Sequence, residues 1–256
     1  MDKYTSLLQK LKDRQPVMMA NIMVCHSPLL MGAFEQADCL LLDKEHGIFG
    51  SEELIPLTMQ CRSLGLPTVV RVEEAQYHLV AKAIDMGADG IMVPRTETVE
   101  QVKTVVEAMH FYPKGRTGFG GFGLMRPGED IERFNRNRVL LLQIESHQGL
   151  EAMEDMIAAY GEFINGFMIG PNDYSIMMGT PLNHGSPAML AEYKQFYDLC
   201  HRHRMSCGTF DPDREHIRRD ADYGANVFWL SDDFNYMKSG FERLIAETKD
   251  IINGTV

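Results

Sequence analysis

Short apolar runs alternate with amphipathic stretches along the whole chain. Short runs rich in Val, Ile and Leu predict strands that are buried on both faces, while apolar residues spaced three or four positions apart predict helices. The predicted strands are Val17–Met23, Cys39–Asp43, Thr68–Val72, Gly90–Val93, Val139–Ile144, Gly166–Ile169, Met205–Gly208 and Asn226–Leu230. The predicted helices are Met1–Arg14, Ser51–Leu64, Ala75–Met86, Val99–Met109, Leu150–Ala159, Ala188–His203, Arg214–Tyr223 and Phe234–Ile252.

This alternation predicts an α/β fold, a (β/α)8 TIM barrel that forms a single domain over residues 1–256. Besides the helices between strands, it includes an N-terminal helix and a C-terminal helix available to pack on a neighbouring subunit. A weak internal repeat supports the barrel, because Met86–Pro94 and Tyr223–Ser231 each read as a glycine at a helix end, a turn and a buried strand. A doubly wound open sheet is the alternative, and it would normally carry a nucleotide-binding loop after its first strand.

A glycine-rich segment between positions 110 and 137 interrupts the alternation. Its stretch Gly118–Gly123 matches the letters of a dinucleotide-binding GxGxxG motif. No predicted strand precedes that stretch and Pro127 follows it, so the structural setting of the motif is missing. A long glycine-rich loop on a barrel is typical of a mobile active-site lid, a subunit contact or a plain connection.

Composition narrows the classes of partner. The net charge of -11 argues against nucleic acid and against an anionic membrane surface. No apolar run approaches the roughly 20 residues that a membrane-spanning helix needs. The five cysteines are an odd number without CxxC spacing, which indicates reduced thiols. Together with a start that does not resemble a signal peptide, these features predict a cytoplasmic protein.

Two carboxylates follow predicted buried strands. Glu145 comes directly after Val139–Ile144, and Asp173 comes shortly after Gly166–Ile169. An ionised acid beside a buried strand is costly unless a cation or ligand compensates it, and barrel enzymes place their sites where strands end. With the neutral donors of Gln143 and Asn172, the pair suits Mg²⁺ or Mn²⁺. Helix N-capping is the alternative, and it explains Asp173 better than Glu145.

Other polar residues fall at strand ends or in unusual settings. Those at strand ends include Asp43, Glu45, Arg95, Asp232 and Asp233. His46 lies at a strand-to-loop junction, where it is either a surface histidine or an acid–base group. Arg71 ends an apolar strand, which indicates either a buried salt bridge or a binding site for a substrate oxyanion. Asp85 opposes the dipole at a helix C-terminus, as a surface residue or as a group that orients a histidine.

These residues occur in a recognisable order of motifs. The motifs are Leu42-Asp-Lys-Glu-His-Gly47, Pro67-Thr-Val-Val-Arg71, Asp85-Met-Gly87, Met92-Val-Pro94, Gly115-Arg-Thr-Gly118, Gln143-Ile-Glu145 and Ile169-Gly-Pro-Asn-Asp-Tyr-Ser175. Over nearly the whole chain, the sequence resembles the HpcH/HpaI aldolase family of metal-dependent pyruvate aldolases, which lies within the phosphoenolpyruvate/pyruvate barrel superfamily.

The resemblance implies a site, a reaction and an assembly. Glu145 and Asp173 would bind Mg²⁺ or Mn²⁺, with Co²⁺ or Zn²⁺ as substitutes, and pyruvate would chelate that ion. Gln143 would lie close by, and the backbone around Gly170, Pro171, Asn172 and Asp173 would bind the pyruvate carboxylate. The catalytic residues would be Arg71, which stabilises an enolate oxygen, and His46. Asp85, from a neighbouring part of the site or a neighbouring subunit, would orient His46 and form with it an acid–base dyad acting through water on the metal. The family implies a homo-hexamer.

The implied reaction is aldol cleavage of a 4-hydroxy-2-oxo acid, derived from a sugar acid or a dicarboxylate, to pyruvate and an aldehyde. The chain departs from the family at Asn21–Pro28, in the glycine-rich loop, and at Asp232 and Asp233. In relatives these regions surround the aldehyde, so the aldehyde is not identified. Three alternatives are an oxaloacetate decarboxylase, an acyl-CoA lyase of the citrate-lyase-β type, and a non-catalytic barrel that binds a metabolite.

Overall fold

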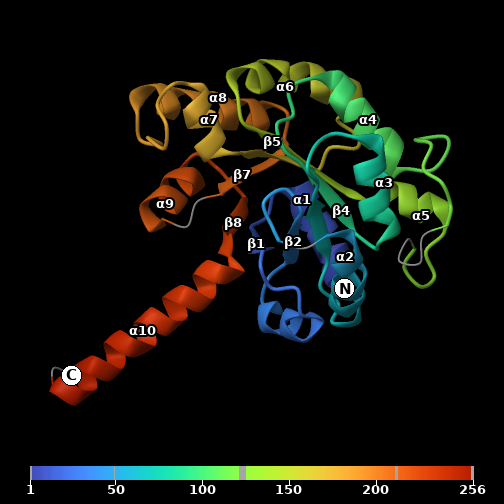
Figure 1. Ribbon diagram of the computed structural model, residues 1–256. Coiled ribbons are helices and arrows are strands. Elements are labelled where there is room, and N and C mark those ends of the chain that lie inside the picture. The colour runs from blue at the N-terminus through green and yellow to red at the C-terminus, as the bar shows by residue number, and fades with distance from the viewer. Residues whose placement is uncertain (1, 49, 121–124, 211–212, 255–256) are drawn as a thin grey trace.

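Eight parallel strands form a closed barrel in which β8 pairs with β1, as the sequence predicts (Figure 1). The computed structural model describes residues 2–48, 50–120, 125–210 and 213–254. The strands are β1 (Val17–Ile22), β2 (Cys39–Asp43), β3 (Thr68–Arg71), β4 (Gly90–Val93), β5 (Val139–Ile144), β6 (Gly166–Ile169), β7 (Ser206–Phe210) and β8 (Val227–Asp232). The open-sheet alternative is therefore wrong.

Helices connect the strands and surround the barrel. The predicted ones are α1 (Lys3–Asp13), α2 (Ser51–Ser63), α3 (Tyr77–Asp85), α4 (Val99–Met109), α6 (His147–Tyr160), α8 (Pro187–Arg202), α9 (Arg214–Asp222) and α10 (Asp233–Asn253). Three short helices were not predicted: η1 (Pro28–Phe34), α5 (Ile131–Arg136) and α7 (Pro171–Met177). Because each has seven residues or fewer, it is too short to give a clear helical periodicity.

The inside of the barrel is a packed apolar core that ends below the site. Side chains such as Met19, Leu41 and Leu141 point inward and form one buried cluster. Leu7 and Leu11 of α1 belong to the same cluster, so α1 closes the end of the barrel where the strands begin. Trp229 of β8 is also a member, and it lines the cavity at the other end. The cavity therefore lies directly against the packed apolar core of the barrel.

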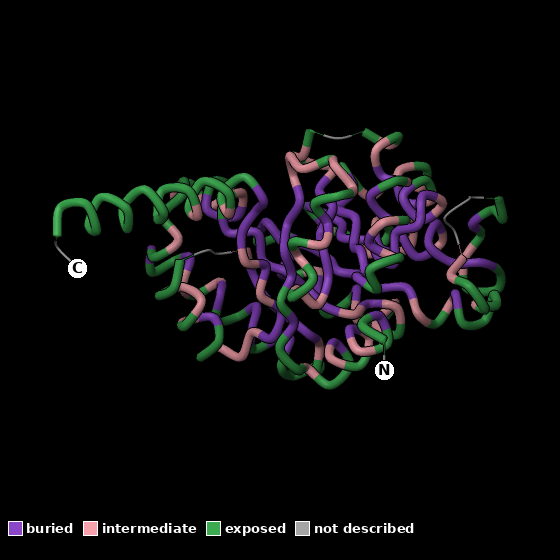
Figure 2. The backbone as a smooth tube through the Cα atoms, turned by 90° about the horizontal axis from the view of Figure 1, so that it is seen from below, coloured by how far each residue is buried: buried purple, intermediate pink, exposed green. Residues whose placement is uncertain are grey.

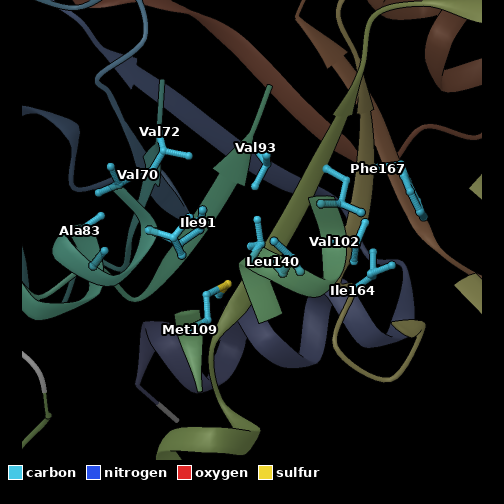
Figure 3. Close-up of a cluster of buried hydrophobic side chains, with 14 of the residues drawn as sticks. Val70, Val72, Ala83, Ile91, Val93, Val102, Met109, Leu140, Ile164 and Phe167 are labelled. Atoms are coloured by element: carbon cyan, nitrogen blue, oxygen red, sulfur yellow. The ribbon is translucent and has the colours of Figure 1, made fainter. Parts of the chain in front are cut away.

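A second apolar layer joins the outer faces of the strands to the surrounding helices. Figure 3 shows part of it. The labelled side chains are Val70, Val72, Ala83, Ile91, Val93, Val102, Met109, Leu140, Ile164 and Phe167. Strand residues of this layer alternate with the inward-facing ones, so both faces of each strand are buried, as expected for a parallel barrel.

The C-terminal helix α10 extends away from the barrel instead of covering it (Figures 1 and 2). Of its 21 residues only Asp233 is buried. Large apolar side chains lie exposed along it: Phe234, Met237, Phe241, Leu244, Ile245, Ile251 and Ile252. Such a surface is typical of a contact with another protein. A search of the described helices finds none with the length and apolar character to cross a membrane.

Candidate active site

A cavity of about 200 Å³ opens where the strands end and their following loops begin. Its lining comes from the ends of seven of the eight strands, all except β4. The lining residues are Asn21, Met23, His46, Arg71, Gln143, Glu145, Gly170, Pro171, Asn172, Asp173, Phe210 and Trp229. The structure thus brings together every residue that the sequence singled out for the site except Asp85.

Arg71 is held in a fixed orientation by a buried carboxylate. Asp43, at the end of the neighbouring strand β2, accepts hydrogen bonds from Nε of Arg71 at 2.9 Å and from its Nη2. Nη1 of Arg71 lies 3.4 Å from Oε1 of Gln143 and 3.1 Å from Oε2 of Glu45. The two-point contact fixes the plane of the guanidinium, so Arg71 presents its charge to the cavity in a defined position.

Glu45 links this buried pair to the rim of the cavity. Its carboxylate contacts Arg71 on one side and Nη2 of Arg95 at 3.0 Å on the other. Burial raises the pKa of Glu45, and the charges of Arg71, His46 and Arg95 oppose that increase. The carboxylate of Glu45 therefore pairs with the charges of two arginines and lies next to His46, rather than facing solvent.

Glu145 lies in a buried pocket next to other acids. Its Oε2 accepts the backbone N–H of Arg95 at 2.8 Å, and its Oε1 accepts from Nε2 of Gln143 at 2.6 Å. The pKa of Glu145 is raised to about 7, chiefly by burial and also by the nearby charges of Glu45 and Asp173, against the hydrogen bond from the Arg95 backbone, which lowers it. The neighbouring residues of the chain therefore offset the cost of burying the negative charge of Glu145 only in part.

Neither acid is a helix N-cap, so the capping alternative is wrong for both. Ser146 is the N-cap of α6, and its side chain accepts from the backbone of Gly149. Gly170 is the N-cap of α7, and half-buried Asp173 lies in the first turn of that helix. Both carboxylates line the cavity instead.

Gly170 lets the chain approach Glu145 more closely than any other residue could. A Cβ atom at this position would lie 2.6 Å from Cγ of Glu145 and 2.7 Å from Nε2 of Gln143, and it would also collide with Oε1 of Glu145. Its backbone φ of -98° is one that any residue adopts, so the glycine is required by space alone. The missing side chain leaves room for the segment that leads to Asp173.

The donor set fits a hard divalent cation. Glu145 and Asp173 supply two carboxylates, and positive charge between them would offset the repulsion and burial that raise the pKa of Glu145. Mg²⁺ and Mn²⁺ commonly take only one or two protein carboxylates and complete their shell with water and substrate. In the described ranges, this site included, no group of three or more His, Cys, Asp or Glu side chains is arranged to hold a metal, so the protein would supply only these two carboxylates.

His46 and Asp85 lie at different ends of the barrel. His46 lines the cavity with its side chain half exposed, and its Nε2 lies 3.7 Å from Oε2 of Glu45. Its backbone N–H donates to Oδ1 of Asp43 at 3.2 Å, which fixes the turn that carries it. Asp85 ends α3 just before β4 begins, so it lies at the amino end of the strands, opposite the cavity. Within one chain the two residues do not form a dyad.

Several side chains gain their importance only in the structure. The sequence marks Asp43 only as one polar strand end among several. Trp229 and Phe210 line the cavity with ring centroids 5.0 Å apart, and they read in sequence as ordinary strand residues.

The acid pair at 232–233 is structural. Asp232 caps α10, and Asp233 accepts hydrogen bonds from the backbone N–H groups of Met23, Val24 and Cys25. Asp233 thereby fixes the loop after β1.

The predicted lid or subunit contact in the glycine-rich loop falls partly outside the described residues. Positions 121–124 of the stretch are not described. On either side of them, Phe119 stacks near Phe111 with a centroid distance of 5.9 Å, and Arg126 pairs with Asp89 at 2.7 Å. Both ends of the loop are thus attached to the barrel, and its role stays a prediction.

Comparisons with known proteins agree with this geometry. The 5-keto-4-deoxy-D-glucarate aldolases of Salmonella arizonae and Klebsiella pneumoniae are 25% and 26% identical over 213 residues, which span 81% of this chain and 82% of each relative. The crystal structure of an HpcH/HpaI aldolase from Desulfitobacterium hafniense superposes with a TM-score of 0.85 at 21% identity, over 95% of this chain and 96% of that one. The sequence profile of the HpcH/HpaI aldolase/citrate lyase family matches residues 26–227. The chain belongs to this family and is a carbon–carbon lyase of the aldolase type.

Proposed function

We propose that the protein cleaves a 4-hydroxy-2-oxo acid to pyruvate and an aldehyde, with a divalent metal ion, Mg²⁺ or Mn²⁺, bound by Glu145 and Asp173. The observation that carries the proposal is the cavity that these two acids share with Arg71, since neither acid is a helix cap. Arg71 is held in place there by Asp43, and Gly170 leaves room beside Glu145. The relatives named as 5-keto-4-deoxy-D-glucarate aldolases support a sugar-acid substrate.

The metal ion, when bound, would polarise the 2-oxo group and lower the free energy of the negative charge that develops there. Gln143 assists by donating to Oε1 of Glu145, which fixes the orientation of that carboxylate. The segment of Gly170, Pro171, Asn172 and Asp173 lines the same side of the cavity and would bind the substrate carboxylate.

Arg71 supplies a second positive charge for the oxygen that becomes an enolate. Its two-point contact with Asp43 holds the guanidinium before the substrate arrives, so little reorganisation is needed during the reaction. Asp43 is thus a positioning residue for Arg71. The stacking of the guanidinium over Trp229, at 4.9 Å from the ring centroid, adds to this fixation.

His46 is the proposed base for cleavage. It takes the proton from the C4 hydroxyl, the C3–C4 bond breaks, and the electron pair of that bond remains with the pyruvate portion as an enolate. The aldehyde then leaves, and a proton returns to C3 to give pyruvate. His46 suits this step because it lines the cavity while its half-exposed ring can exchange protons with water.

The size of the cavity favours a small oxo acid over an acyl-CoA. About 200 Å³ accommodates a molecule of a few carbons, and Glu145, Asp173 and Arg71 of the lining supply the charged groups for an oxo acid. A decarboxylase would use the same enolate chemistry without needing a base for a hydroxyl group, so the position of His46 favours aldol cleavage.

We further propose that the active form is a homo-oligomer, a hexamer as in the resembled family. The exposed apolar side chains of α10 support it, as does an apolar cavity of about 620 Å³ beside that helix, lined by residues such as Leu30, Phe34 and Met237. In such an assembly, the Asp85 that orients His46 would come from a neighbouring copy of the chain. We also propose that the protein is cytoplasmic, because its five free thiols suit the reducing conditions of that compartment.

Pyruvate release from a panel of 4-hydroxy-2-oxo acids, coupled to lactate dehydrogenase, tests the proposal. We expect turnover that EDTA abolishes and added Mg²⁺ or Mn²⁺ restores. Glu145→Gln and Asp173→Asn should lose this turnover, while Glu97→Gln, an acid near the cavity that bonds to Ser146 instead, should keep it. Turnover that is insensitive to EDTA would refute the metal-dependent mechanism, and no turnover on any member would refute aldol cleavage.

A further inference from the structure

A carboxylate outside the cavity contacts the helices that follow both candidate metal ligands. Glu192 of α8 is mostly buried, with 14% of its side chain exposed. Its Oε2 accepts a hydrogen bond from the hydroxyl group of Tyr174 at 2.6 Å and lies 3.2 Å from Nδ1 of His147. Tyr174 comes directly after Asp173, and His147 begins α6 two residues after Glu145. One side chain thus contacts both segments that carry the acids of the cavity.

The two acids are held in place differently. Glu145 accepts hydrogen bonds directly from Arg95 and Gln143. Among the described residues, none donates a hydrogen bond to the carboxylate of Asp173, so its position depends on the helix that carries it. That helix, α7, has only seven residues, and so short a helix needs tertiary contacts to be stable. The placement of Asp173 therefore depends on what anchors α7.

Tyr174 anchors α7 to the rest of the barrel. Its side chain is completely buried in the apolar layer between strands and helices, where a hydroxyl group without a partner is costly. Glu192 supplies the partner, and a hydrogen bond to an ionised carboxylate is stronger than one between neutral groups. Because Tyr174 can bury its hydroxyl group favourably only where it meets Glu192, this bond fixes how α7 packs. Asp173, its neighbour in the same turn, is fixed with it.

We propose that Glu192 is a positioning residue for the metal site, which holds Asp173 at the right place relative to Glu145 through its bonds to Tyr174 and His147. The inference rests on the proposed function, because it concerns the ion that the two acids would bind. Glu192 does not line the cavity, so it acts only through its neighbours. The three helices that it joins, α6, α7 and α8, lie side by side (Figure 1).

Binding of Mn²⁺ measured by calorimetry, together with unfolding in urea, tests this role. Tyr174→Phe removes only the hydroxyl group, and Glu192→Leu removes its acceptor. Both should weaken Mn²⁺ binding about 10-fold, the lower end of the range for groups that orient metal ligands. Glu192→Gln keeps an oxygen that can accept from Tyr174, so it should bind Mn²⁺ more tightly than Glu192→Leu does. A higher Mn²⁺ concentration should restore the pyruvate release that Tyr174→Phe loses.

Two control variants separate positioning from a general loss of stability. Thr58→Val removes a buried hydroxyl group that donates to the carbonyl oxygen of Met86, next to the end of α3. It should lower the free energy of unfolding but keep the Mn²⁺ affinity of the wild type. Glu154→Gln weakens a different ion pair between α6 and α8, the one with Arg202, and should also keep that affinity.

The outcomes distinguish this inference from the proposed function. Wild-type Mn²⁺ affinity in Tyr174→Phe and Glu192→Leu would overturn the role of Glu192, and so would an equal loss of affinity in Thr58→Val. If the wild-type protein bound no Mn²⁺, the proposed metal site would be refuted, and the role of Glu192 with it. If Tyr174→Phe does not fold, the two Glu192 variants decide, and equal Mn²⁺ affinities of Glu192→Gln and Glu192→Leu would overturn the inference.

Discussion

Gly170→Ala tests how tightly the two ends of the acid site are packed against each other. The added methyl group would lie 2.6 Å from Cγ of Glu145 and 2.7 Å from Nε2 of Gln143. Carbon–carbon contacts are favourable near 3.5–4.0 Å, so either Glu145 or the start of α7 must move by about 1 Å. The backbone itself accepts alanine, because φ is -98°.

The displacement should affect function far more than stability. Overpacking of this kind costs about 1–3 kcal/mol of folding free energy, which a folded variant tolerates. A displacement of about 1 Å between catalytic groups can cost about 100-fold in rate. We expect Gly170→Ala to bind Mn²⁺ at least about 10-fold more weakly and to lose about 100-fold in kcat/KM for pyruvate release, while circular dichroism shows an intact fold.

Gly185→Ala is the matched control, because an added Cβ there meets no atom within 4 Å. It should retain the Mn²⁺ affinity and the kcat/KM of the wild type. If Gly170→Ala retained both as well, the close approach of Gly170 to Glu145 would have no role in the site, and the argument from packing would be refuted.

Three further predictions concern stability and assembly. Asp43→Asn weakens the buried pair with Arg71 and should lower the free energy of unfolding, measured in urea, by up to about 3–5 kcal/mol; an unchanged value would contradict the structural role of the pair. Burial lowers the pKa of His110 to about 4 from its ordinary 6.5, so its neutral form stabilises the fold above pH 6.5, and that stability is lost as pH falls toward 4. The loss approaches about 1.4 kcal/mol per pH unit, and the unfolding free energy of His110→Gln should fall less steeply between pH 6.5 and 4.5. Mixed oligomers of His46→Ala and Asp85→Ala chains should regain cleavage activity that neither variant has alone, whereas no recovery would exclude a dyad between subunits.

The barrel could be predicted from sequence because each strand is a short apolar run flanked by clear helix signals. Cys39–Asp43, Gly90–Val93 and Val139–Ile144 have the predicted bounds. The last two strands begin one residue later and end two residues later than predicted. There, polar residues such as Thr209 and Asp232 continue the strand pairing, and a polar side chain gives no apolar signal.

Much of the cavity lining could also be predicted, because residues at the carboxyl ends of parallel strands must meet. The part that could not be predicted depends on three-dimensional contacts. The side-chain bonds between Asp43 and Arg71 are not visible in a sequence, nor is the close approach of Gly170 to Glu145. By contrast, the separation of Asp85 from His46 follows from the predicted elements, because a residue at the end of a helix that precedes a strand lies at the amino end of a barrel.

Binding of Mn²⁺ measured by isothermal titration calorimetry tests the central claim most directly. The account predicts a site in the wild-type protein that is weakened at least about 100-fold in Glu145→Gln and in Asp173→Asn, because each loses one of the two carboxylates. Glu97→Gln, the acid near the cavity that does not line it, should bind as the wild type does. Wild-type affinity in both site variants would contradict the assignment of Glu145 and Asp173 as the metal ligands.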